Sequence, residues 1–254
     1  MRLLFLQKKG LQMNSILSGN KKIHVLTDMD EVLVNISPKW IMNVYNHPQL
    51  DGKFNREKVD SLLDHYDDFI EALLLRDEYY IEKWLEIEDE SAKALCRNIY
   101  EQDNTFYDDL GATHLANELR FALARGAITL TVISHCVNEQ SAASKKQWLE
   151  KFFDGLTVEF ICVPLNEKKS DEVIARKLNY QVFIDDMVKN AEDVMTLTGS
   201  PDKNFMVPYL GYNMVDLASF ADRIDDSKGK VLVSAVKELD MLEEIAEKKH
   251  PKTE

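Results

Sequence analysis

Short apolar runs rich in β-branched residues alternate along the chain with stretches in which apolar residues recur every three or four positions. The runs predict buried strands over residues 23–27, 128–133, 158–163, 182–184 and 205–207. The periodic stretches predict helices over residues 114–125, 140–153, 170–178 and 190–197. Because strands and helices of this length alternate, we expect an α/β fold of the Rossmann-like type, with a mostly parallel sheet covered by helices on both faces.

Two segments depart from this alternation. Residues 37–110 contain few strand-like runs, and their leucine and aromatic side chains recur at helical spacing, so we expect a helical insertion after the first strand. Near the C-terminus, a stripe of apolar residues at helical spacing predicts a helix whose apolar face packs on the core. The alternative is that this face forms a dimer interface. The members of this stripe are Leu232, Val236, Leu239, Leu242 and Ile245.

These patterns divide the chain into three parts. Residues 22–36 and 111–254 form the expected α/β core, and residues 37–110 form the expected helical cap. Residues 1–21 carry no periodicity, so we expect a loosely attached N-terminal arm, with a translation start at Met13 instead of Met1 as an alternative.

Composition narrows the classes of partner. The 254 residues include 31 Lys+Arg and 44 Asp+Glu, a formal net charge of −13, which argues against extended nucleic-acid binding. No apolar run approaches the roughly 20 residues of a membrane span, so we expect no membrane partner. Cys96, Cys136 and Cys162 are too few and too scattered for a disulfide framework or a zinc site, so we expect a reducing, cytoplasmic location.

Polar residues follow the predicted strands at the points where those strands end. Asp28 and Asp30 come after the first strand, Ser134 after the second, and Asp185 and Asp186 after the fourth. Since ligands bind beyond the carboxyl ends of parallel strands, we expect these side chains to share one site. Taken singly, the pair Asp28 and Asp30 is more typical of a loop or a helix cap, the Asp-Asp pair is also typical of a cap, and Ser134 is about equally typical of an ordinary strand end. Two acidic strand ends on one sheet nevertheless indicate function.

The chemistry of this set favours a cation. Several carboxylates in one crevice repel each other unless a positive charge lies among them. Oxygen ligands of this kind suit Mg²⁺, which often shares a substrate phosphate. Lys168 and Lys169 follow the third strand just before a helix, where a lysine can neutralise a transferring phosphoryl group, although a solvated surface lysine is the alternative for either. We therefore expect Mg²⁺ as the cofactor and a small phosphorylated compound as the substrate.

In this order, the residues resemble the motifs of the haloacid dehalogenase superfamily of phosphohydrolases. Residues 28–32 (Asp-Met-Asp-Glu-Val) resemble its first motif, Asp-x-Asp-x-(Thr/Val), and the Asp-Asp pair at 185–186 resembles its fourth. Ser134 resembles the second motif, and Lys169 or Lys168 the third. The resemblance covers about residues 22–200, and it implies a haloacid dehalogenase-type fold with a cap inserted after the first motif.

Within that superfamily, the chain looks most like the 5′(3′)-deoxyribonucleotidase group. Residues 28–33 are typical of that group, except that Glu31 stands in place of the usual Gly, and residues 146–153 resemble a segment that follows its second motif. The resemblance implies that Lys146 faces the substrate phosphate. It also implies that His135, which replaces the usual second hydroxyl, touches the substrate, with a structural histidine as the alternative.

The resemblance further implies a mechanism. Asp28 attacks phosphorus and forms an aspartyl-phosphate, and Asp30 protonates the leaving oxygen and then activates water. Asp28, the backbone carbonyl of Asp30 and one carboxylate of residues 185–186 hold Mg²⁺. Ser134 and Lys169 support the charge that develops on the phosphoryl group.

The cap is expected to exclude water and to read the leaving group. It carries aromatic side chains that could stack on a nucleobase, with core packing as the simpler alternative for each: Trp40, Tyr45, Tyr79, Tyr80, Trp84, Phe106 and Tyr107. The leading hypothesis is therefore a Mg²⁺-dependent phosphatase acting on nucleoside monophosphates. The alternatives are a phosphatase for sugar phosphates or nucleic-acid ends, and a noncatalytic binding protein of the same fold, which Glu31 motivates.

Overall fold

The computed structural model describes residues 22–65, 76–103, 105–208, 210–221 and 227–234. Six strands form one sheet in the order β3-β2-β1-β4-β5-β6, and every neighbouring pair is parallel. They are β1 (Ile23–Thr27), β2 (Ile128–Cys136), β3 (Val158–Pro164), β4 (Val182–Ile184), β5 (Asn204–Pro208) and β6 (Lys230–Ser234). The strand order reverses between β1 and β4, which is where an open α/β sheet binds its ligands.

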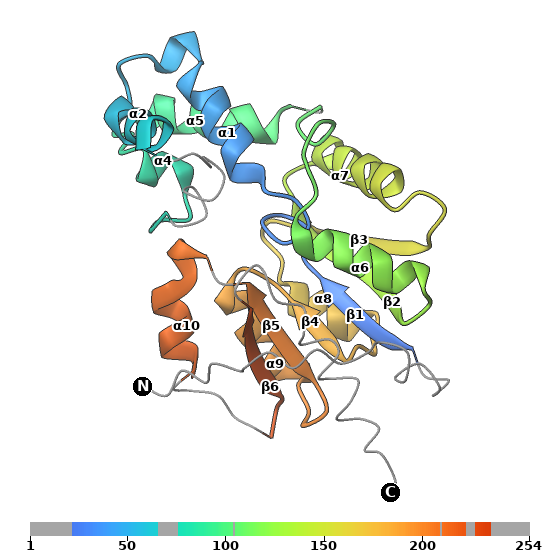
Figure 1. Ribbon diagram of the computed structural model, residues 1–254. Helices are drawn as coiled ribbons and strands as arrows, with labels where there is room; N and C mark the ends of the chain where they lie inside the picture. The colour runs from blue at the N-terminus through green and yellow to red at the C-terminus, as the bar shows by residue number, and fades with distance from the viewer. Residues whose placement is uncertain (1–21, 66–75, 104, 209, 222–226, 235–254) are drawn as a thin grey trace, which may run out of the picture.

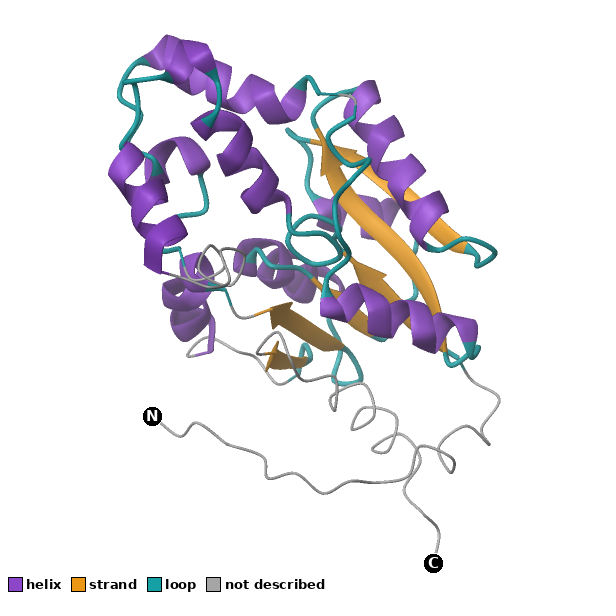
Figure 2. Ribbon diagram, turned by 45° about the horizontal axis from the view of Figure 1, so that its top comes forward, coloured by secondary structure: helices purple, strands orange, loops and turns teal. Residues whose placement is uncertain are grey.

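Helices cover both faces of this sheet (Figures 1 and 2). Two helices pack on one face and three on the other: α6 (His114–Ala124) and α7 (Glu139–Phe152), then α8 (Lys169–Ala175), α9 (Val188–Thr198) and α10 (Met214–Ala221). Val25 of β1 belongs to the apolar cluster on the first face and the next residue, Leu26, to the cluster on the second. A strand whose successive side chains are both apolar is buried on both faces of its sheet. The predicted α/β fold with a parallel sheet covered on both faces is therefore confirmed.

A helical segment separates β1 from α6. It consists of α1 (Ile36–Tyr45), the 3₁₀ turn η2 (Pro48–Leu50), α2 (Arg56–His65), α4 (Ile81–Trp84) and α5 (Glu90–Glu101). Figure 1 shows these helices gathered beyond the carboxyl ends of the strands. Buried apolar side chains between Ile41 and Cys96 form a third apolar cluster, separate from the two that lie on the two faces of the sheet. The helical character of this segment agrees with the prediction, and the boundaries of core and cap stay a prediction.

β6 corrects one prediction. The stripe that begins at Leu232 predicts a helix, but residues 230–234 form a strand parallel to β5. The reason is that the run Val231-Leu232-Val233 carries two β-branched residues and extends the edge of the sheet. The rest of the stripe and the arm at 1–21 lie outside the described residues. β2 also continues to Cys136, so Ser134 and His135 belong to the strand itself.

Two observations bear on the expectations drawn from composition. Within the described part of the chain, no helix is both long and apolar enough to cross a membrane. Cys96, Cys136 and Cys162 are free thiols, the first two buried and the third exposed.

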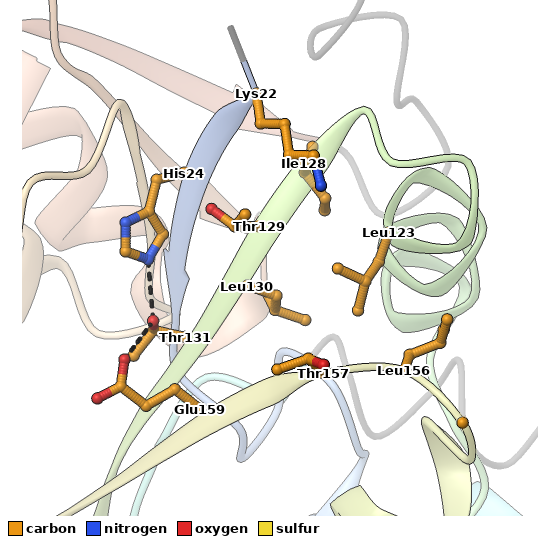
Figure 3. A pocket seen from close by; sticks show the side chains of 11 residues that line it. Lys22, His24, Leu123, Ile128, Thr129, Leu130, Thr131, Leu156, Thr157 and Glu159 are labelled. Atoms are coloured by element: carbon orange, nitrogen blue, oxygen red, sulfur yellow. Dashed lines mark hydrogen bonds between the residues drawn. The ribbon is translucent and has the colours of Figure 1, made fainter.

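A hollow of about 470 Å³ lies at the amino ends of the first three strands (Figure 3). His24 Nε2 lies 2.9 Å from the hydroxyl of Thr131, which donates to Glu159 Oε2 at 3.1 Å. Leu123 and Leu156 line the apolar side of the hollow. This hollow is at the opposite end of the sheet from the acidic residues singled out above, so it is separate from the site described next.

The central strand β4 should dominate the stability of the core. Phe183 is fully buried and its ring lies 6.3 Å from those of Tyr180 and Phe205. We expect Phe183→Ala to lower the free energy of unfolding by about 3–5 kcal/mol, because it leaves a cavity between packed rings. The control is Phe121→Ala on α6, where the ring is 51% exposed and the loss should stay below about 1 kcal/mol. Urea unfolding of both variants measures this, and equal losses would contradict the described packing.

Candidate active site

The turn after β1 brings two carboxylates to the carboxyl edge of the sheet. The backbone N–H of Asp28 donates to the Ile184 carbonyl of β4 at 2.8 Å, which holds the start of the turn against the neighbouring strand. The N–H groups of Leu33 and Val34 then donate to the Met29 carbonyl at 2.7 and 3.2 Å and close the turn. Asp28 and Asp30 are thereby held within a compact loop.

Three aspartates from two strands meet at this edge. Ligand oxygens of Asp28, Asp185 and Asp186 all lie within 4.8 Å of one another, and all three side chains are buried. Asp185 Oδ1 accepts hydrogen bonds from the Met187 N–H at 2.9 Å and from Asn190 Nδ2 at 3.0 Å. These bonds fix the carboxylate that follows β4 before α9 begins.

Lys169 bridges the two strands. Its ammonium lies 2.7 Å from Asp28 Oδ2 and 2.7 Å from Asp185 Oδ2, and its side chain is only 1% exposed. Lys168, the other candidate, is on the surface and pairs with Asp193 at 3.0 Å. The structure therefore places Lys169, and not its neighbour, in the acidic cluster.

The charges of this cluster are unequally compensated. Burial opposes ionisation of Asp28, yet the ammonium groups of Lys169 and Lys145 outweigh it and hold the pKa of Asp28 below its usual value. Burial raises the pKa of Asp185 to about 6 despite the nearby Lys169. Burial and the two neighbouring carboxylates raise the pKa of Asp186 well above its usual value. A further cation among these oxygens would relieve this cost, so the residues present fit a Mg²⁺ site.

A second group of contacts surrounds Asp30, on the other side of the turn. Lys145 donates from its ammonium to Asp30 Oδ2 at 2.7 Å, to Ser134 Oγ at 2.9 Å and to the His135 carbonyl at 2.7 Å. The lysine is fully buried, and its three acceptors come from β2 and from the turn. Lys145 thus joins the predicted second motif to the predicted acid–base residue.

Lys146, which the resemblance put in the site, is not brought there by the structure. Its side chain is 64% exposed and its ammonium lies 3.8 Å from Glu150. One residue along an α-helix turns the side chain by about 100°, and Lys145 is the residue on the buried face. The pattern contained a signal for this, since Lys145 precedes the buried Trp148 and Leu149 by three and four positions.

His135 contributes its backbone to the site. The carbonyl accepts from Lys145, as described, whereas ring atom Nε2 lies 3.0 Å from the Glu167 carbonyl. Burial, followed by the positive charge of Lys169, lowers the pKa of the imidazole below its usual value. The ring is thus neutral at physiological pH, and its predicted contact with substrate stays a prediction.

Aromatic side chains from the helical segment reach Asp30. Tyr107 donates to Oδ1 at 2.7 Å and Tyr100 donates to Oδ2 at 3.0 Å. Burial, followed by the charge of Asp30, raises the pKa of both phenols well above their usual value, so both stay protonated. Tyr107 was among the aromatic candidates, but for stacking on a base, and Tyr100 was missed because its spacing reads as ordinary helix packing.

Most of the other aromatic candidates pack as the simpler alternative expects. Trp40 stacks on Tyr100 with ring centroids 4.9 Å apart, and Trp84 belongs to the apolar cluster of the helical segment. Tyr79 differs, because its ring lies edge-on to Tyr212 at 5.2 Å, and Tyr212 donates to Asp186. Tyr212 belongs to the 3₁₀ turn η3 (Gly211–Asn213), which the sequence patterns did not predict.

Glu31 stands where the backbone takes a left-handed conformation. Its φ is +55°, a region that favours glycine and costs other residues about 1 kcal/mol. The carboxylate is buried and accepts from both the N–H (2.9 Å) and the hydroxyl of Ser37 at the start of α1. Arg76 Nη2 lies 3.8 Å from it, and the guanidinium lies 4.6 Å from the Tyr212 ring. The glutamate therefore links the turn to the helical segment.

Comparison with known proteins bears on the fold that holds these residues. No protein-family model matches the sequence, and no curated protein does. A haloacid dehalogenase-like hydrolase from Streptococcus pneumoniae has a TM-score of 0.53 at 13% identity, over 88% of this chain and 98% of its own. A candidate β-phosphoglucomutase from Thermotoga maritima has a TM-score of 0.51 at 18% identity, over 87% and 99%. A candidate hydrolase of the same class from Bacillus subtilis, solved bound to magnesium, has a TM-score of 0.50 at 12% identity, over 89% and 99%.

At these identities the likeness concerns the architecture alone. The chain has the α/β fold of the haloacid dehalogenase-like hydrolases, with a cluster of buried acidic residues at the carboxyl ends of its strands.

The acidic cluster predicts a metal-dependent change in stability. We expect Mg²⁺ to raise the Tm, because binding at 100 times Kd stabilises a fold by about 2.7 kcal/mol. Asp186→Asn should abolish this shift, and without metal it should not lower the Tm, since it removes one of three crowded carboxylates. Thermal unfolding with Mg²⁺ or EDTA measures both effects, with the exposed Asp154→Asn as control. A shift of equal size in the Asp186 variant would contradict the proposed ligand set.

Proposed function

We propose that this protein is a Mg²⁺-dependent phosphatase that hydrolyses phosphomonoesters through a covalent intermediate on Asp28. The observation that carries the proposal is the pairing of Asp28 with Lys169 at 2.7 Å inside a buried acidic cluster. The lysine keeps the Asp28 carboxylate ionised, and an ionised carboxylate is the form that can attack phosphorus.

In the proposed reaction, the two carboxylates held by the turn after β1 have different roles: Asp28 is the nucleophile, and Asp30 is the acid and then the base. Asp28 attacks phosphorus, the ester P–O bond breaks, and its electron pair leaves on the ester oxygen, which takes a proton from Asp30. Asp30 then accepts a proton from water as that water attacks the aspartyl-phosphate, which regenerates Asp28. Lys145 donates to Asp30 and to Ser134, so its positive charge lies beside the acid–base residue during both steps, and the Ser134 hydroxyl can donate its own hydrogen to a phosphoryl oxygen.

The metal belongs to the other side of the turn. Asp28, Asp185, Asp186 and the backbone carbonyl of Asp30 are the groups that we propose to hold Mg²⁺. When bound, the ion would neutralise the repulsion between the carboxylate nucleophile and the dianionic phosphate.

We further propose that the substrate is a nucleoside monophosphate. Support comes from Tyr79 and Tyr212, two aromatic rings 5.2 Å apart beside the acidic cluster. Tyr212 donates to Asp186, so this pair of rings lies next to one of the proposed metal ligands. An aromatic face at this position suits a planar base. We also propose that the partner is this small phosphorylated compound and that the protein is located in the cytoplasm.

The experiment is Mg²⁺-dependent phosphate release over a panel of nucleoside monophosphates and sugar phosphates. We expect release to require both Mg²⁺ and Asp28, and Asp28→Asn to reduce it to background, because the variant lacks the nucleophile. Unchanged release by that variant would overturn the assignment. Binding of Mg²⁺ and a phosphate analogue without turnover of any compound would favour the noncatalytic alternative.

The two adjacent lysines on α7 provide a matched pair of variants. Lys145→Met should lower kcat/KM by about 10²–10³-fold, because it removes the buried charge that contacts Asp30 and Ser134. Lys146→Met should change it by less than about twofold, since its side chain is 64% exposed and pairs with the exposed Glu150. Circular dichroism of both variants controls for folding. Equal losses, or a larger loss at Lys146, would return the phosphate-facing role to Lys146.

A further inference from the structure

Two tyrosines of the helical segment enclose the carboxylate of Asp30. The hydroxyl of Tyr107 lies 2.7 Å from Oδ1, that of Tyr100 lies 3.0 Å from Oδ2, and the two hydroxyls are 3.0 Å apart. The three groups therefore form a closed ring of hydrogen-bonding distances. Neither tyrosine is part of the motifs that predicted the site.

The two rings are held firmly. Tyr100 stacks on Trp40 and lies edge-on to Phe106 at 5.1 Å, and Tyr107 is 1% exposed and lies edge-on to Phe106 at 5.7 Å. Asp30 keeps 16% of its side-chain surface exposed, which leaves an approach for a substrate. Rings packed in this way can fix the carboxylate without occupying that approach.

We propose that Tyr100 and Tyr107 are positioning residues that hold Asp30 both as a carboxylate and as a protonated acid, and that they therefore matter most when the leaving group needs a proton, as it does in phosphate esters of alcohols. The inference rests on the proposed phosphatase function. An alkoxide is a poor leaving group and needs a proton as the P–O bond breaks, whereas a nitrophenolate leaves without one. A site that holds its acid through several directed bonds is matched to the first kind of substrate.

The hydrogen bonds can be balanced for both states of Asp30. In the carboxylate, both tyrosines donate to Asp30, and no hydrogen lies between their oxygens. In the acid, Lys145 at 2.7 Å from Oδ2 leaves Oδ1 as the better place for the proton. Oδ1–H then donates to Tyr107, Tyr107 donates to Tyr100, and Tyr100 keeps its bond to Oδ2. One hydroxyl hydrogen rotates, and no heavy atom moves.

The transfer step completes the cycle. As the P–O ester bond breaks, its electron pair remains on the leaving oxygen. The Oδ1–H turns from Tyr107 to that oxygen, and the proton passes to it. The hydroxyl of Tyr107 then turns back from Tyr100 to Oδ1, and Asp30 is again a carboxylate with two tyrosine donors. Neither tyrosine gains or loses a proton, so each acts through Asp30 and not on the substrate.

The test compares two leaving groups in phenylalanine variants. Kinetic constants are measured for wild type, Tyr107→Phe and Tyr100→Phe with a nucleoside 5′-monophosphate and with p-nitrophenyl phosphate. We expect Tyr107→Phe to lower kcat/KM, which reports only the steps up to formation of the aspartyl-phosphate, by about 10–100-fold for the alkyl ester and by less than about threefold for the nitrophenyl ester. Tyr100→Phe should show the same selectivity, with a smaller loss. The control is Tyr180→Phe, an equally buried tyrosine whose hydroxyl pairs with Thr198 at 2.8 Å away from the site.

The outcomes separate this inference from the proposed function. Equal losses of kcat/KM for both esters, or losses no greater than those of Tyr180→Phe, would show that the tyrosines only have a packing role and would overturn the inference. Wild-type turnover of the nitrophenyl ester alone, with no alkyl ester hydrolysed, would also overturn it while leaving a phosphatase. Turnover of neither ester by the wild type would overturn the proposed function, and the inference with it.

Discussion

The ammonium of Lys169 lies between the carboxylates of Asp28 and Asp185, 2.7 Å from each, with almost none of its side chain exposed to water. Without a cation at this point, two buried carboxylates on neighbouring strands would face each other, and Asp186 would add a third. Lys169 is the first residue of α8, and the two aspartates follow the neighbouring strands β1 and β4. The contact therefore forms only if α8 begins beside the carboxyl ends of this pair of strands. The nucleophile that we propose is a consequence of the arrangement, because the same lysine keeps Asp28 ionised. The pKa values of Asp185 and Asp186 remain raised, so a metal ion among their oxygens would be favourable.

The turn after β1 divides the site into two halves with different electrostatics. Asp28 belongs to the acidic half, and Asp30, two residues later, belongs to a half in which Lys145 and two tyrosines donate to it. This separation suits a reaction that needs one carboxylate as nucleophile and another as acid and base. Glu31 connects the turn to the helical segment. Its backbone takes the left-handed conformation inside the turn, and its carboxylate contacts Ser37 and Arg76 of that segment.

Much of this arrangement could be predicted from residue patterns. Alternating apolar runs and helical stripes imply parallel strands, and parallel strands bring Asp28, Ser134 and Asp185 to one edge whatever the details of the helices. Predictions failed where a single helical step decides the outcome: Lys145 and Lys146 differ by one position, and only the burial of Trp148 on the same face separates them. They also failed where a role depends on contact between segments far apart in the sequence. Tyr100 reaches Asp30 across 70 positions, and Tyr212 reaches Asp186 from a short 3₁₀ turn, so no local pattern marks either one.

The central claim is that Asp28 carries the phosphoryl group. Reduction of an acyl phosphate with borohydride converts the modified aspartate to homoserine, so the protein is mixed with substrate and Mg²⁺, quenched, reduced and analysed by peptide mass spectrometry. Our account predicts homoserine at position 28, dependent on substrate and absent without it. An unmodified Asp28 under conditions in which phosphate is released, or modification at another carboxylate such as Asp30 or Asp185, would contradict it.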